Sequence, residues 1–181
     1  MRIGVYCSAN PNIDQEFICA TEELGRWIGE KGHSLVWGGC SLGLMNIIGE
    51  EAQKAGARCI GVLPKKIEER GRIFHNLDLC IPCHTLSDRK DLLVANSDIT
   101  IALPGGIGTL DEVMTQCAAS TVGYHSKPVI LFNIKGFWNP LIALLDHFER
   151  ENLMRGNYRD RIKTASSIEE IEAIVETYLH P

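Results

Sequence analysis

A glycine-rich segment near the middle of the chain carries the clearest chemical signal. Residues 103–112 read LPGGIGTLDE and follow an apolar run at residues 99–103. A glycine-rich turn between a strand and a helix presents backbone N–H groups at the N-terminus of the helix, where an anion binds. We therefore expect a phosphate site in this turn, with the Glu112 carboxylate in the first turn of the helix. A carboxylate placed there can bind ribose hydroxyls or activate water.

Thr109 and Glu112 also fit a purely structural interpretation. Their spacing is that of a capping box, in which Thr109 is the N-cap and Glu112 folds back onto its N–H group. Asp111 is expected on the surface, where a carboxylate near the helix N-terminus complements the helix dipole. The residue pattern alone leaves both interpretations of Glu112 open.

Two adjacent cations, Arg89 and Lys90, lie where another helix is expected to begin. Ser87 or Asp88 can cap that helix. The ordinary interpretation is a solvated surface pair, but cations in a first turn oppose the helix dipole. A phosphate or carboxylate ligand would relieve that mismatch, with arginine suited to two-point contacts and lysine to a point charge.

The seven cysteines are expected to be thiols in a reducing compartment. Residues 80–84 read CIPCH, which fits the spacing of a c-type haem attachment site, and a CxxC pair also binds zinc or performs redox chemistry. Haem attachment requires export, and the sequence shows no export signal. A zinc site requires a second pair of ligands, and only His75 and His84 are near. We therefore expect buried strand cysteines at Cys80 and Cys83, and no metal site.

Composition limits the classes of protein. A chain of 181 residues is expected to form one domain, residues 1–181, with 45% apolar and 23% charged residues. The net charge of -5 argues against a general nucleic-acid binder. No apolar run approaches the roughly 18 residues of a membrane span, and the N-terminus does not resemble a signal peptide. We expect a cytoplasmic protein without nucleic-acid or membrane partners.

Strand-like and helix-like segments alternate along the chain. Strands are predicted at residues 2–7, 33–37, 58–63, 77–82, 99–103 and 128–133. Helices are predicted at residues 13–31, 44–55, 87–96, 109–122, 140–149 and 168–179, with a polar loop at 64–76. This alternation predicts an α/β fold with a doubly wound parallel sheet and helices on both faces.

Three loops are expected to meet beyond the carboxyl ends of the strands, where such sheets bind ligands. They are residues 7–10, residues 38–43 and residues 104–109. Neither glycine-rich loop is a dinucleotide fingerprint, and neither is a Walker loop, since no Gly-Lys-Ser/Thr follows. The ligand predicted from these loops is a mononucleotide or a sugar phosphate.

Together these motifs resemble the LOG family, cytokinin riboside 5′-monophosphate phosphoribohydrolases. Residues 104–112 match the family signature PGGxGTxxE, and Arg89-Lys90 match the Arg-Lys pair that precedes it at the same separation. The resemblance extends over nearly the whole chain. It includes Tyr6-Cys7-Ser8, Trp37-Gly38-Gly39, Gly43-Leu44-Met45, Lys127-Pro128-Val129 and residues 136–141.

The resemblance implies a Rossmann-like fold and a homodimer, or a higher homo-oligomer, with sites near the interface. It implies hydrolysis of the N-glycosidic bond of a nucleoside 5′-monophosphate, with Arg89 and Glu112 as the catalytic pair and no metal or organic cofactor. Members are often labelled lysine decarboxylases, but the residues here give no basis for pyridoxal phosphate chemistry. The substrate would be bound by Lys90, Ser8, Gly105, Gly106, Ile107, Gly108, Thr109, Gly39 and Gly43.

Several positions depart from the family pattern. Leu86-Ser87 stand where many plant members have Met-His, towards the base pocket by resemblance. Ala118 replaces a threonine, and Cys40 and Asn46 replace glycines of the second loop. The segment 64–82 matches poorly, although Glu68 or Glu69 is a candidate pocket acid. The base is therefore open between AMP, another purine nucleotide and an isopentenyladenosine phosphate.

A second class of function uses the same fold. Molybdenum-cofactor carriers and some nucleotide-sensing or DNA-processing domains of this fold hold a ligand without transforming it. A binding module requires the glycines but not the arginine–glutamate pair. The presence of Arg89, Lys90 and Glu112 together therefore favours the enzyme.

Overall fold

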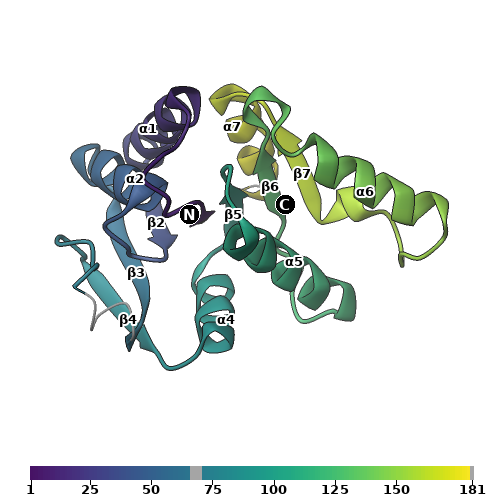
Figure 1. Cartoon of the computed structure of the whole chain (residues 1–181), viewed down its shortest axis with the longest axis horizontal. Coiled ribbons are helices and arrows are strands. Elements are labelled where there is room, and N and C mark those ends of the chain that lie inside the picture. Colours follow the sequence, from purple (N-terminus) through teal and green to yellow (C-terminus); the bar gives the residue numbers. More distant parts are fainter. Residues whose placement is uncertain (66–70, 180–181) are drawn as a thin grey trace.

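A seven-stranded parallel sheet runs through the centre of the computed structural model, which describes residues 1–65 and 71–179 (Figure 1). The strands lie in the order β4-β3-β2-β1-β5-β6-β7. Their bounds are β1 (Arg2–Tyr6), β2 (Ser34–Trp37), β3 (Arg58–Pro64), β4 (Leu79–Cys83), β5 (Ile99–Ala102), β6 (Val129–Phe132) and β7 (Ile162–Ala165).

Helices cover both faces of this sheet, and each group shares its own apolar core (Figure 1). One face carries α1 (Gln15–Glu30), α2 (Gly43–Lys54) and α7 (Ile168–Leu179), and the other carries α4 (Leu86–Asn96), α5 (Ile107–Val122) and α6 (Asn139–Arg150). Leu24 and Ile171 are fully buried in the first core, and Leu93 and Val113 are buried in the second. This arrangement confirms the predicted α/β fold with a doubly wound parallel sheet.

The direction of winding reverses at β1. From β1 the chain adds β2, β3 and β4 on one side and, after returning, β5, β6 and β7 on the other. β1 and β5 pair from Ile3 with Ile99 to Tyr6 with Ala102, so the loops that follow them leave the sheet side by side. In open α/β sheets ligands bind at such a switch point. The fold therefore brings the loop after β1 next to the glycine-rich loop after β5.

Every predicted strand and helix is present, with bounds within two residues, but one strand was not predicted. β7 has the pattern Ile-Lys-Thr-Ala, with the two ends buried and the middle more exposed. It lies at the edge of the sheet beside β6, and short edge strands carry a weak periodic signal because only part of their surface is buried.

The polar segment predicted as a loop at residues 64–76 is more ordered in its described part. Ile73 forms an antiparallel bridge with Cys40, and the Phe74 N–H donates to the carbonyl of Gly39 at 2.8 Å. Phe74 is buried and packs edge-to-face on Trp37 with ring centroids 5.4 Å apart. This segment therefore supports the second glycine loop. The candidate pocket acids Glu68 and Glu69 lie outside the described residues.

The expectation of buried strand cysteines is confirmed for Cys83 and wrong for Cys80. β4 is an edge strand, and successive side chains of a strand point to opposite faces, so Cys83 is buried while Cys80 is exposed. Within the described ranges, no group of three or more His, Cys, Asp or Glu side chains is placed to hold a metal ion. No helix among these residues has the length and apolar character needed to cross a membrane.

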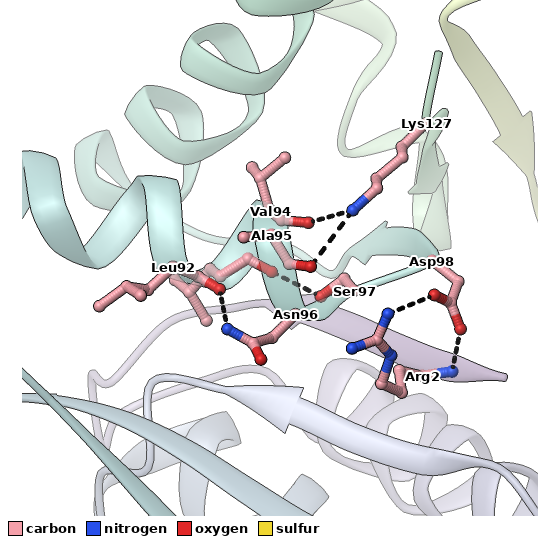
Figure 2. A network of polar contacts seen from close by, with 9 residues as sticks. Arg2, Leu92, Val94, Ala95, Asn96, Ser97, Asp98 and Lys127 are labelled. Atoms are coloured by element: carbon pink, nitrogen blue, oxygen red, sulfur yellow. Dashed lines mark hydrogen bonds and ion pairs between the residues drawn. The ribbon is translucent and has the colours of Figure 1, made fainter. Parts of the chain in front are cut away.

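A lysine holds the C-terminal end of α4 in place (Figure 2). The Lys127 ammonium donates to the carbonyl oxygens of Val94 at 2.7 Å and of Ala95 at 3.4 Å. The Ser97 hydroxyl donates back into the same turn. A cation at this end of a helix satisfies unpaired carbonyls and complements the dipole. The opposite end of α4 carries Arg89, so Lys127 helps to fix the helix that presents this side chain.

Replacing Lys127 with methionine is expected to lower the free energy of unfolding by about 1–2 kcal/mol, because the Val94 and Ala95 carbonyls lose their donor. Urea denaturation measures this value. Lys54→Met is the matched control, since its ammonium pairs with Glu51 on an exposed surface, and it should change stability by less than about 0.5 kcal/mol. Equal effects of the two substitutions would contradict the structural role of Lys127.

Candidate active site

The predicted catalytic pair and part of the predicted binding set line one cavity of about 250 Å³ at the switch point. It lies where the loops after β1 and β5 meet the first turns of α2, α4 and α5. Its walls are formed by Cys7, Ser8, Ala9, Met45, Arg89, Gly106, Gly108, Thr109 and Glu112. Four segments that are distant in the sequence therefore contribute to a single site.

The glycine-rich loop opens directly into α5 without a side-chain cap. Gly106 is the N-cap residue, and no described side chain bonds to the first N–H groups of this helix. Gly106, Ile107 and Gly108 are exposed, so these N–H groups are accessible. The first turn of a helix leaves four N–H groups without intrahelical partners, and an anion satisfies them together with the helix dipole. This loop is suited to hold a phosphate group.

The capping-box interpretation of Thr109 and Glu112 is wrong. The helix begins at Ile107, two residues before the predicted start, so Thr109 lies inside its first turn and is 3% exposed. Thr109 packs on Gly105, where an added Cβ would lie 2.1 Å from the threonine hydroxyl oxygen. Gly105 therefore has no room for a side chain, because Thr109 occupies that place.

The second glycine loop shapes the site without lining it. Gly39 and Gly43 have backbone φ angles of 59° and 54°, a region that residues with a side chain rarely adopt. A Cβ on Gly43 would also lie 2.5 Å from the Asn10 carbonyl oxygen, and the Leu44 N–H donates to the Ser8 carbonyl at 3.0 Å. These contacts hold the start of α2 against the loop after β1, which places Ser8 at the wall of the cavity.

Arg89 and Glu112 form a buried pair inside the cavity. Nη1 of Arg89 lies 3.7 Å from Oε1 of Glu112, and their side chains are 11% and 9% exposed. The Arg89 Nε donates to the carbonyl of Val62 at 3.3 Å, whereas Nη2 finds no hydrogen-bond partner among residues 1–65 and 71–179. The guanidinium therefore meets Glu112 through Nη1 and keeps hydrogen-bonding capacity that the described side chains and carbonyls do not use.

The surface interpretation of Arg89 is therefore wrong, and the reason lies in the start of α4. Thr85 is the N-cap and forms a capping box with Asp88, instead of a cap at Ser87 or Asp88. The helix consequently begins at Leu86, and Arg89 projects from its first turn towards the sheet. The Arg89 N–H donates to the Thr85 carbonyl at 3.1 Å, which confirms its place inside the helix.

The structure does not bring Lys90 to the cavity wall. Its ammonium donates to Asp111 at 2.8 and 2.9 Å and to the Thr115 hydroxyl at 2.9 Å. These contacts join α4 to α5 beside the site. Lys90 therefore affects the cavity indirectly: its contacts help to hold α5 in place, and its charge lowers the pKa of Glu112.

Burial dominates the protonation of Glu112. It raises the pKa of this carboxyl to about 7, while the Arg89 guanidinium favours the ionised form and lowers the pKa. The same burial, with the Glu112 charge nearby, raises the pKa of the Tyr6 phenol and of the Cys7 thiol. A carboxyl that exchanges its proton near neutral pH is suited to general acid–base work.

The raised pKa of Glu112 predicts a pH-dependent stability. The folded state retains the Glu112 proton from pH 4.5, the ordinary value, up to about pH 7, whereas the unfolded state loses it. The free energy of unfolding should therefore fall by about 3 kcal/mol as the pH rises through this window and then level off. Urea denaturation at several pH values measures the decrease. Glu112→Gln should remove it, and an unchanged slope in that variant would assign the decrease to another group.

A buried hydrogen-bond network lies one helical turn beyond Glu112. The Tyr6 hydroxyl donates to Oε1 of Gln116 at 2.8 Å, and the Thr100 hydroxyl donates to the same oxygen at 2.7 Å. The network joins β1, β5 and α5. Sequence reasoning did not assign Gln116 a role, although a polar residue four positions after Glu112 lies on the same helix face. Cys7 and Met45 belong to segments that the sequence analysis singled out, but neither was assigned a role, and the fold places both at the cavity wall.

Fold and site define a class: a Rossmann-like α/β protein with an uncapped helix start beside a buried arginine–glutamate pair. The chain belongs to the LOG family. Residues 45–175 match the family model described as "Possible lysine decarboxylase". A "Probable cytokinin riboside 5'-monophosphate phosphoribohydrolase" of Oryza sativa subsp. japonica is 34% identical over 180 residues, 98% of this chain and 79% of that protein. A cytokinin riboside 5′-monophosphate phosphoribohydrolase of Arabidopsis thaliana is 32% identical over 98% of this chain and 84% of its own length.

Solved structures with the same fold include proteins named for binding or carrying the molybdenum cofactor. The molybdenum cofactor binding protein from Rippkaea orientalis is 27% identical, with a TM-score of 0.73 over 98% of this chain and 96% of that chain. The molybdenum cofactor carrier protein from Chlamydomonas reinhardtii is 25% identical, with a TM-score of 0.75 over 99% and 98%. These similarities confirm the Rossmann-like fold.

Proposed function

We propose that the protein hydrolyses the N-glycosidic bond of a nucleoside 5′-monophosphate, either AMP or an N6-modified adenosine monophosphate. The products are the free base and ribose 5-phosphate. One observation carries this proposal: the buried Arg89–Glu112 pair lies in the same cavity as the uncapped start of α5. The named relatives, about one third identical over nearly the whole chain, support the same activity.

The phosphate end of the substrate is assigned to the start of α5. The N–H groups of the turn at Gly106, Ile107 and Gly108 would bind the phosphate oxygens, with Ser8 on the facing wall. The phosphate is remote from the bond that breaks, so its binding energy can position the ribose without stabilising the ground state at the reacting carbon. A nucleoside without the phosphate is therefore expected to react poorly.

The reacting bond is assigned to the space beside Glu112. As the C1′–N bond breaks, positive charge develops on the ribose, and a fixed carboxylate stabilises it. The oxygen of a water molecule attacks C1′ and Glu112 takes one proton from this water. The base leaves with the electron pair of the broken bond and receives a proton from solvent, and Glu112 then returns its proton to solvent. The Arg89 guanidinium keeps part of the Glu112 population ionised and binds the ribose or the phosphate.

The residues do not fit the decarboxylase named in the family description. Pyridoxal phosphate chemistry requires a lysine that forms a Schiff base with the cofactor. None of the described residues that line the cavity is a lysine, and the Lys90 ammonium is bound to Asp111 and Thr115. We derive no step through that cofactor.

A non-catalytic carrier is the second candidate, favoured by the solved molybdenum cofactor proteins that share the whole fold. A carrier would use the helix start to hold a phosphate. It would not require Glu112 to titrate near neutral pH beside a guanidinium.

Base release distinguishes the two functions. The purified protein is incubated with AMP, GMP, CMP and isopentenyladenosine monophosphate, with the matched nucleosides as controls, and free base is quantified by chromatography. The enzyme should release base from monophosphates only, and the ranking of rates identifies the preferred base. Binding of AMP, seen as a raised melting temperature, with no base released from any compound would overturn the proposal in favour of a carrier.

We also propose that the protein is a homodimer. Large apolar side chains are exposed near the ends of α4 and α5: Leu86 is 66%, Val122 is 73% and Tyr124 is 81% exposed. Leu86 lies at the start of α4, and Val122 and Tyr124 lie at the end of α5, so this helix layer carries exposed apolar side chains at both of its ends. Light scattering on the purified protein measures the mass, and a monomer would contradict this proposal without affecting the proposed chemistry.

A further inference from the structure

The guanidinium of Arg89 lies directly against a glycine. Gly38 follows β2 and is buried, and an added Cβ would lie 1.9 Å from Nη2 of Arg89 and 3.1 Å from its Cζ. A third atom, Cε of Met45, would be 3.3 Å away. The guanidinium therefore occupies the space that any side chain at residue 38 would need.

A second contact holds the same guanidinium from β3. The Arg89 Nε donates to the carbonyl of Val62 at 3.3 Å. β2 and β3 are paired neighbours, so Gly38 and Val62 form one surface at the carboxyl ends of two adjacent strands. On its other side the guanidinium meets the cavity, where Nη1 lies 3.7 Å from Glu112. Arg89 is thus confined between a bare backbone surface and the site.

Space, and not backbone conformation, explains the glycine at residue 38. Gly39 and Gly43 of the same loop have positive φ, but Gly38 does not. An alanine at residue 38 therefore does not meet the cost of a positive φ. The atom that must move to admit its methyl group is the end of a flexible side chain, and the cavity gives that side chain somewhere to go.

We propose that Gly38 is a positioning residue for the proposed hydrolysis: with the Val62 carbonyl it holds the Arg89 guanidinium at the cavity wall beside Glu112. This inference rests on the proposed function for its kinetic consequence. Its geometric content, that residue 38 sets the position of Arg89, is independent of which substrate the site takes.

Gly38→Ala tests the proposal with two measurements. Base release should lose about 10- to 100-fold in kcat, since the displaced guanidinium enters the space of the substrate. The second measurement is the pKa of Glu112, from carbon NMR of labelled carboxyl groups in the unliganded protein. Charged or titratable groups around Glu112 come from α4 (Arg89, Lys90), α5 (Asp111) and β1 and its loop (Tyr6, Cys7). Of these groups Arg89 lies nearest to a Cβ at residue 38, so its displacement should raise the pKa of Glu112.

Gly25→Ala is the matched control. Its Cβ would lie 2.7 Å from Cβ of Glu51 and 3.0 Å from the backbone nitrogen of Ala52, where α1 packs on α2 away from the site. It should lower the melting temperature while leaving kcat and the pKa of Glu112 unchanged. Gly38→Ala should instead lower kcat and raise the pKa of Glu112 while leaving the melting temperature nearly unchanged. This difference separates a positioning role from a general loss of stability.

A double-mutant cycle with Arg89→Lys isolates the contact. In Arg89→Lys the guanidinium that meets residue 38 is replaced by a smaller ammonium, so the contact to be tested is already lost. Adding Gly38→Ala to this variant should therefore change kcat by less than about twofold. Equal losses in both backgrounds, or an unchanged pKa of Glu112 in Gly38→Ala, would overturn the proposal. If the unmodified protein hydrolyses no nucleotide, the proposed function fails, and the pKa measurement alone still decides whether Gly38 positions Arg89.

Discussion

Glu112→Gln is expected to lower kcat for base release by about 1,000-fold while the protein stays folded. Glutamine has nearly the same shape, but it carries no negative charge to stabilise the developing positive charge on the ribose and cannot take a proton from water. Glu112→Gln leaves the start of α5 unchanged, and the phosphate is assigned to that helix start. The affinity of the variant for AMP should therefore equal that of the unmodified protein. Chromatographic base release gives kcat, and calorimetry gives the affinity.

Glu51→Gln is the control for this substitution. Glu51 is also a helical glutamate with little exposure, and it pairs with an arginine, Arg26, but it lies between α1 and α2 away from the cavity. It should keep full activity. Retention of normal hydrolysis by folded Glu112→Gln would remove Glu112 from the chemistry and, with it, the mechanism proposed for this site.

Arg89→Met is expected to lower kcat/KM by about 100-fold, the second-largest effect. Methionine fills much of the buried volume but removes the donors at the cavity wall. It also removes the charge that favours ionised Glu112, so the pKa of Glu112 should rise further and the active pH range should move upward. Arg89→Lys should restore part of the activity through its charge, without the two-point geometry.

A pH–rate profile separates these contributions. If Arg89 acts through Glu112, the acidic limb of the profile, which reports ionisation of Glu112, shifts to higher pH in Arg89→Met. Arg26→Met is the control, since this half-exposed arginine pairs with Glu51 on the α1–α2 surface. An unshifted acidic limb in Arg89→Met, with activity lost, would limit Arg89 to direct contact with the substrate.

The parts of the fold that could be predicted from the sequence are those with strong periodic burial. β5 and β6 are buried throughout, and β1 is buried after its first residue, so they appear in the sequence as apolar runs between turn signals. β7 could not be found, because an edge strand with Lys163 and Thr164 at its centre has no such run. Helix starts were less certain than helix bodies, since Thr85, Ser87 and Asp88 are all competent caps and tertiary packing selects Thr85.

Within the site, the glycine loop and the Glu112 carboxylate could be predicted because their chemistry lies in one short segment. The burial of Arg89 could not, because the groups that contact it, Gly38 and Val62, belong to other strands of the sheet and their loops. Charged residues near a helix start are usually solvated, so a local pattern favours the surface interpretation that proved wrong. Gly38 itself gives no local signal beyond its residue type.

The bare start of α5 has a consequence for the lifetime of the protein. Asp14 caps α1 and Thr85 caps α4, whereas α5 begins without a side-chain cap, as α2 and α6 also do. Of these bare starts, that of α5 is the one assigned here to the phosphate of the proposed substrate. A ligand that binds the folded state alone lowers the fraction of unfolded chains in proportion to its occupancy. If that ligand is the proposed nucleotide, a fall in its concentration exposes the chain more often to proteases, and the abundance of the protein is expected to follow the supply of nucleotide.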